Sequence, residues 1–255
     1  MRVPDVGVTR EWAFAGATGR GVDVAVVDSG IDAAHPAVGE VAGGAALRWD
    51  RERQEIESVE GPHEDLFGHG TACAGIIRKA APECRLLSVR VLGERLSGKG
   101  LVFAEGIRWA VRSGARVVNL SMSTGNEDLH SLLHDVADEA YFAGTVLVCA
   151  VNNVRAASYP SQYASVISVA ANDATGPFDI DCNPHPPVEF GAPGIDLEVA
   201  WLGGGTIVAT GNSFAAPHVA GLVARLLSKH PDLVPAEVKS VLRAVSRNAL
   251  PVSAG

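Results

Sequence analysis

Alternation between short apolar runs and amphipathic stretches is the feature that most limits the folds open to this chain. Stretches in which apolar residues recur three and four positions apart are typical of helices. They lie at 70–79, 101–112 and 129–142. Runs rich in Val, Ile and Leu between them predict buried strands at 22–27, 86–91, 116–120, 146–150 and 166–170. This alternation predicts an α/β fold of three layers, with helices on both faces of a mostly parallel central sheet.

Length and composition bound the domain count and the partners. The 255 residues suffice for one sizeable core, and no repeat or linker-like stretch divides them, so we expect a single domain over 1–255. An apolar content of 47%, with 28 glycines and 14 prolines, indicates a compact, turn-rich protein rather than a mainly disordered one. A net charge of −8 argues against sequence-independent binding of nucleic acid, which depends on basic surfaces.

The N-terminal residues and the cysteines bear on location. The opening MRVPD has no apolar core of a signal peptide, and no later stretch approaches the ~20 apolar residues of a membrane span. We therefore expect a cytoplasmic protein with no membrane partner. Its cysteines show no Cys-x-x-Cys spacing and are expected to be reduced thiols; in an exported chain, three disulfide pairings would be open. They are Cys73, Cys84, Cys149 and Cys182.

One acidic segment interrupts the alternation. Residues 48–65 contain seven acidic side chains and three arginines. A charged surface excursion is the ordinary interpretation of such a run. The alternative is that it lines a cleft beside His69 and favours basic substrates.

Three residues with catalytic potential lie at the ends of predicted elements. Asp28 follows the strand 22–27, and His69 stands between two glycines directly before a helical stretch. Ser213 lies at a loop-to-helix junction within 211–221. Histidine suits general-base work near neutral pH, and a helix N-terminus offers N–H groups to an oxyanion. Each residue alone has a structural explanation, such as a helix cap or a turn. Their combination points to nucleophilic catalysis.

Four motifs carry a family resemblance. They are DSGID at 28–32 followed by His35-Pro36, HGT at 69–71, APG at 192–194 and NSFAAPH at 212–218. In the chain order Asp, His, Ser, the sequence resembles the subtilisin-like serine proteases over about 22–242. That order separates the family from chymotrypsin-like enzymes and α/β-hydrolases.

The resemblance implies a fold, a reaction and roles. The fold would be the three-layer subtilisin-like one, and the reaction peptide-bond hydrolysis by a serine endopeptidase through an acyl-enzyme, without a cofactor. Ser213 would be the nucleophile, His69 the base and then the acid, and Asp28 the carboxylate that orients the imidazole. The family's oxyanion donor, an asparagine just past an apolar strand, maps to Asn152, with Asn153 as the alternative.

The resemblance also implies how a peptide or protein substrate is held. The family binds substrate as an added strand between two extended segments, here 97–100 and 121–123. The pocket for the residue before the cleaved bond (P1) would have walls at 121–123 and 149–151, with Ser158 as its floor. The expected substrate-binding residues are Gly98, Lys99, Gly100, Ser121, Met122, Ser123, Cys149, Ala150, Val151 and Ser158.

Departures from the family pattern lead to further expectations. Ser123, Val151 and Ser158 stand where glycine is usual, which predicts a shallow pocket that prefers small residues. Asn212 replaces a usual threonine and Phe214 a usual methionine beside the nucleophile, so turnover is expected to be slow.

Metal binding and regulation complete the expectations. The stretch 76–82 runs directly into the next strand and lacks the family's calcium-binding loop, so we expect no metal there. His130 and His134 are four apart on a helix but have no evident third zinc ligand. Without a pro-segment, a cytoplasmic protease would need restricted substrate choice or a regulatory or inhibitory protein partner. The alternative function is a catalytically silent relative that binds peptides.

Overall fold

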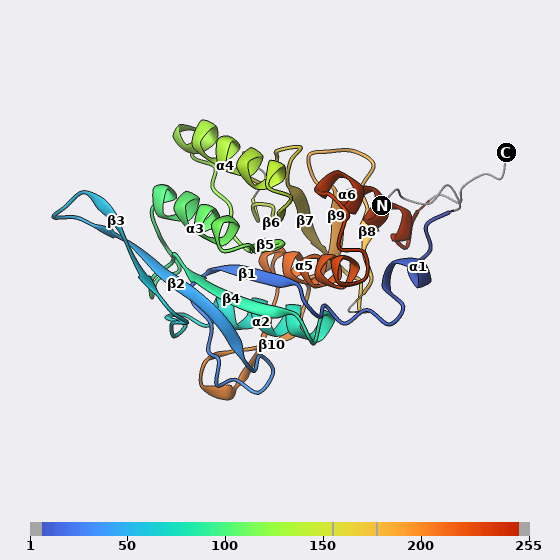
Figure 1. Ribbon diagram of the computed structural model, residues 1–255, viewed down its shortest axis with the longest axis horizontal. Coiled ribbons are helices and arrows are strands. Elements are labelled where there is room, and N and C mark those ends of the chain that lie inside the picture. Colours follow the sequence, from blue (N-terminus) through green and yellow to red (C-terminus); the bar gives the residue numbers. More distant parts are fainter. Residues whose placement is uncertain (1–6, 155, 177, 250–255) are drawn as a thin grey trace.

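A nine-stranded sheet is the centre of the fold in the computed structural model, which describes residues 7–249 except 155 and 177 (Figure 1). The strand order is β3-β2-β4-β1-β5-β6-β7-β9-β8. The strands from β2 to β9 in this order run parallel, whereas β3 and β8 pair antiparallel at the two edges. The strands are β1 Asp23–Asp28, β2 Val41–Asp50, β3 Glu55–Glu60, β4 Arg85–Arg90, β5 Val117–Leu120, β6 Val146–Ala150, β7 Ile167–Asn172, β8 Asp181–Cys182 and β9 Phe190–Pro193.

Helices cover both faces of this sheet. One core joins the sheet to α2, α5 and α6, and a second core joins its other face to α3 and α4. The prediction of a three-layer, mostly parallel α/β fold is therefore confirmed. The helices are α1 Arg10–Phe14, α2 His69–Ala80, α3 Gly100–Arg112, α4 His130–Phe142, α5 Asn212–Lys229 and α6 Pro235–Val245; two short 3-10 helices lie at Glu127–Leu129 and Leu202–Gly204, and a separate hairpin pairs β10 Leu197–Ala200 with β11 Thr206–Ala209. None of the described helices combines the length and apolarity needed to cross a bilayer.

Strand β1 shows why the apolar runs identified the sheet. Val24 and Val26 pack into the core that contains α2 and α5, whereas Ala25 and Val27 pack into the core that contains α3 and α4. Successive side chains of a strand point to opposite faces, so a strand covered on both sides needs apolar residues throughout. All five strands predicted from such runs are present, and their ends agree with the prediction to within two residues.

The acidic segment is mostly a hairpin. Its first part belongs to β2 and β3, which pair antiparallel and project from the body of the molecule (Figure 1). Side chains of β3 are largely exposed, and Arg48 pairs with Glu57 across the hairpin at 2.7 Å. The pocket that contains His69 has no lining residue from the described segment 48–65. Asp65 is the exception to a solvated run, because it is only 7% exposed.

Candidate active site

Three neighbouring parallel strands deliver polar residues to one edge of the sheet. The strand order places β1, β5 and β6 side by side, with β5 between the other two. Asp28 is the last residue of β1, Ser121 follows β5, and Asn152 lies two residues beyond β6. Ligand sites in parallel sheets form at the carboxyl ends of the strands. The sheet therefore gathers these side chains from segments far apart in the sequence.

His69 is held by Asp28. As the first residue of α2, it places Nδ1 2.9 Å from Oδ1 and 2.8 Å from Oδ2 of the Asp28 carboxylate. The Ser29 N–H donates to Oδ1 of Asp28 at 2.7 Å, and both members of the pair are buried. Because Nδ1–H donates to the carboxylate, Nε2 is the nitrogen left to accept a proton.

Opposing effects set the protonation of this histidine. Burial of the ring is the largest single effect and lowers the pKa of His69, but the negative charge of Asp28, the neighbouring Cys73 and the hydrogen bonds of the ring to both residues together outweigh burial. The net effect is a His69 pKa well above its ordinary value of about 6.5. Burial, together with the Asp28 charge, raises the pKa of the neighbouring Cys73, which therefore remains a neutral thiol at neutral pH.

Close backbone packing explains the glycines on either side of His69. A Cβ at Gly70 would lie 2.0 Å from the carbonyl oxygen of Gly30, so the first turn of α2 touches the backbone directly after β1. Gly68 has φ 111°, and a Cβ there would lie 2.6 Å from the Trp201 ring. The glycines thus fix the approach of His69 to Asp28; they do more than leave access to the imidazole.

Asp65 is a site residue that the sequence interpretation missed. Its Oδ1 accepts hydrogen bonds from the N–H groups of Phe67 and Gly68 and from the Ser29 hydroxyl, at 2.7–2.9 Å. Its Oδ2 accepts the Thr71 N–H at 2.9 Å and the Thr71 hydroxyl at 2.6 Å. One buried carboxylate therefore ties the start of α2 to the residue after Asp28. Its position four residues before His69 was the available signal, but it was counted as part of the acidic run.

Ser213 is the second residue of α5 and is half-buried. The Cys73 sulfur lies 3.7 Å from the Ser213 carbonyl oxygen and 4.0 Å from Nδ1 of His69. The Phe214 ring packs with its centroid 5.4 Å from that of His69. Between the described residues Ser213 and His69 no direct hydrogen bond forms, and such bonds often tighten only when substrate is bound.

Asn152 and Asn153 both lie beside the start of α5. Oδ1 of Asn152 accepts the N–H of Val154 at 3.3 Å, so the acceptor of this side chain is already engaged and its Nδ2 is the group that can donate. Oδ1 of Asn153 accepts the N–H of Asn212 at 3.2 Å, so this side chain caps the helix that carries Ser213. The two asparagines therefore have different hydrogen-bond partners. Of the two, Asn153 is the one whose side-chain oxygen accepts a hydrogen bond from the helix.

Two pockets contain most of the expected substrate-binding residues. A pocket of ≈410 Å³ is lined by His69, Gly98, Lys99, Gly100, Ser121, Met122 and Ser123, with Phe103 and Leu129 among its apolar residues. A second pocket of ≈340 Å³ is lined by Val151, Asn152 and Ser158. Cys149 and Ala150 line neither pocket, because their side chains are buried within the core.

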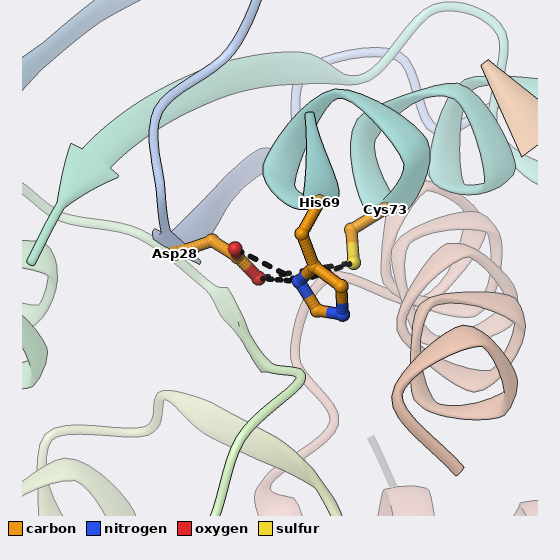
Figure 2. A group of neighbouring side chains, drawn as sticks. All are labelled: Asp28, His69 and Cys73. Carbon is orange, nitrogen blue, oxygen red and sulfur yellow. Dashed lines mark hydrogen bonds and ion pairs between the residues drawn. The ribbon is translucent and has the colours of Figure 1, made fainter. Parts of the chain in front are cut away.

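One group of metal-ligand donors exists among the described residues. Asp28, His69 and Cys73 place their donor atoms within 4.8 Å of one another. Their side chains point toward one another from the end of β1 and the first turns of α2 (Figure 2). An ion bound there would need the lone pairs of Nδ1 and of the Asp28 carboxylate. The hydrogen bond between Asp28 and His69 would then be lost. The donor set therefore fits the orientation of a catalytic histidine better than a resident metal. His130, considered with His134 as a possible zinc ligand, packs its ring edge-on against the rings of Tyr159 and Tyr163.

The fold and this arrangement define an α/β protein with an Asp-His pair and a helix-borne serine at the carboxyl edge of a parallel sheet. The model of the Subtilase family matches residues 19–252, and the chain belongs to that family.

Subtilisin from Bacillus pumilus is 32% identical over 246 residues, covering 91% of this chain and 86% of the relative. Subtilisin E from Bacillus subtilis (strain 168) is also 32% identical, and the aligned part covers 62% of its length. The chain thus spans less than two thirds of that relative. Among solved structures, a cold adapted subtilisin-like serine proteinase matches with a TM-score of 0.73 and 25% identity, covering 94% of this chain and 88% of that one.

Proposed function

We propose that the protein is a serine endopeptidase. The observation that carries the proposal is the buried Asp28–His69 pair, with both carboxylate oxygens within 2.9 Å of Nδ1, beside the N-terminus of the helix that bears Ser213. A silent peptide-binding domain would have no need of a histidine whose pKa is raised by a buried carboxylate. Membership of the Subtilase family supports the same reaction.

The proposed reaction has two halves. The Ser213 hydroxyl attacks the substrate carbonyl while Nε2 of His69 takes its proton, and Asp28 stabilises the imidazolium that forms. The Ser213 N–H and the Asn152 amide donate to the oxyanion. His69 then gives its proton to the leaving amine, which departs and leaves an acyl ester on Ser213. Water attacks that ester with His69 again as base, which releases the acid and restores the hydroxyl.

A serine-reactive peptide phosphonate tests this function. We expect one covalent adduct per chain, detected by intact mass and located on Ser213 by peptide mapping. The reaction should require native folding, so urea-unfolded protein serves as the control. Peptide binding without any adduct would instead favour the silent, peptide-binding alternative.

The proposed substrate is an extended peptide with a small P1 residue. One wall of the proposed P1 pocket is tied to the floor segment, because Thr124, next to the wall 121–123, and Tyr159, next to the floor residue Ser158, exchange two backbone hydrogen bonds of 2.9 and 2.8 Å. The Ser158 hydroxyl accepts the Asn152 N–H at 2.8 Å and a hydrogen bond from Ser161 at 2.7 Å. These bonds hold the wall and floor segments in place and oppose widening. They support a shallow pocket.

Matched peptides that differ only at P1 test this preference. We expect kcat/KM for Ala at P1 to exceed that for Phe by about 10-fold or more, because a bulky ring would clash with the Val151 side chain. Val151→Gly should reduce the preference, whereas Val59→Gly on the exposed hairpin strand should leave it unchanged. Faster cleavage after Phe or Leu by the unmodified protein would contradict the proposal.

We propose a cytoplasmic location and restricted activity for this protein. All four cysteines are free in the structure, which supports a reducing compartment such as the cytoplasm. A protease acting there would need narrow substrate choice or an inhibitory protein partner, and the tied P1 pocket agrees with the first of these.

A further inference from the structure

Asn212 is the residue before the proposed nucleophile. Both polar atoms of its side-chain amide form hydrogen bonds. Its Oδ1 accepts the N–H of Ala171, the next-to-last residue of β7, at 2.8 Å. Its Nδ2 donates to the carbonyl oxygens of Val151 and Asn152, each at 3.2 Å. A threonine, with one hydroxyl, has a single proton to donate and could not supply both of these carbonyl bonds.

The loop after β6 also accepts a hydrogen bond from the backbone of Asn212. Oδ1 of Asn153 accepts the backbone N–H of Asn212 at 3.2 Å. This N–H belongs to the first turn of α5, where no carbonyl of the helix itself can reach it. Three consecutive residues, Val151, Asn152 and Asn153, are therefore joined to Asn212, and the loop and the helix N-terminus form one hydrogen-bonded unit.

These bonds connect the two halves of the proposed oxyanion hole. One donor, the Ser213 N–H, is adjacent to Asn212 in the chain, and the backbone carbonyl of the other donor, Asn152, is bonded to the Asn212 amide. Oxyanion donors act only when they lie about 2.7–3.1 Å from the developing charge, so their separation must be held closely. We propose that Asn212 is a positioning residue that sets this separation. The inference rests on the proposed peptidase function.

Asn212→Asp is the sharpest variant. It keeps the size of the side chain and the acceptor for the Ala171 N–H, but it turns a carboxylate oxygen toward two carbonyl oxygens. We expect kcat for peptide hydrolysis to fall by about 10- to 100-fold with KM changed less than about 2-fold, because the misplaced donors serve the transition state. Asn183→Asp is the matched control, since it removes an exposed Asn-to-carbonyl bond, to His185, and should retain kcat.

A double-mutant cycle separates positioning from general destabilisation. If Asn212 acts through Asn152, the loss caused by Asn212→Asp should shrink by at least half, on a logarithmic scale, in an Asn152→Ala background. Losses that multiply fully, or a kcat unchanged by Asn212→Asp, would overturn the proposal.

Amide hydrogen exchange supplies a readout that needs no turnover. Peptides covering 151–154 should exchange about 10-fold faster in Asn212→Asp than in Asn183→Asp, whereas peptides from β1 should not change. Equal exchange in the two variants would overturn the inference even in an active protein. Absence of phosphonate labelling in the unmodified protein would instead reject the peptidase function, and faster exchange would then still support the hydrogen-bonded unit.

Discussion

Replacing Ser213 by alanine is expected to lower kcat for peptide hydrolysis by about 10⁶-fold, the loss measured for the corresponding change in subtilisin. The change removes the hydroxyl oxygen that forms the acyl ester in the proposed reaction, while the half-buried site at the start of α5 loses little packing. Initial rates with a chromogenic peptide check the result. The melting temperature should change by no more than a few degrees, because no described hydrogen bond of the Ser213 hydroxyl is lost.

Ser240→Ala provides the control for that experiment. It makes the same chemical change on α6, at an exposed residue remote from the site, and should retain full activity. Adding His69→Ala to Ser213→Ala should cost little more, because the two groups act as a unit. A Ser213→Ala protein that kept more than a few per cent of the activity would show that another residue is the nucleophile.

Asp28→Asn should have the second largest effect, a fall in kcat of about 10⁴-fold, as in other Asp-His-Ser enzymes. The amide cannot stabilise the imidazolium, and its NH₂ group can face Nδ1 and favour the wrong tautomer of His69. Asp135→Asn on the exposed side of α4 is the matched control and should be fully active. A loss of less than about 10-fold would mean that Asp28 does not orient the base.

The same variant should move the pH profile in a defined direction. His69 must be neutral to accept the serine proton, so kcat/KM rises as pH passes upward through the His69 pKa. In the unmodified protein the Asp28 charge raises that pKa, which places the acid limb above about pH 6.5. In Asp28→Asn the charge is gone while burial, which lowers the pKa, remains. The acid limb should therefore shift to lower pH, and a shift to higher pH or an activity maximum near pH 4 would contradict this assignment.

Local sequence predicted the elements that pack into the cores. The strand that ends at Asp28 carries a continuous apolar run, because it is covered by helices on both faces of the sheet. The helix that begins at His69 carries apolar residues at helical spacing, because its inner side packs into one of these cores. Strand β2 was missed, since its glycines and charged end give no such run. Its pairing with β4 and β3 comes from tertiary contacts that no local pattern encodes.

The candidate site divides in the same way. Asp28, His69 and Ser213 were found from motifs at element ends, where chemistry and local structure coincide. Asp65 was assigned to a solvated run, because nothing local shows that Ser29, far away in sequence, donates to its carboxylate. Asn212 was identified as a departure from the family, but its bonds to Val151 and Ala171 depend on how the strand ends meet.

The close approach of Gly70 to the backbone of Gly30 bears on which substitutions the chain can accept. Backbone touches backbone there, and a Cβ at Gly70 would also lie 3.2 Å from Cβ of Asp28. The separation of the base from its carboxylate is therefore set by main-chain contact and not by the size of nearby core side chains. Substitutions elsewhere in the two cores can accumulate over generations while the distance between Asp28 and His69 stays the same.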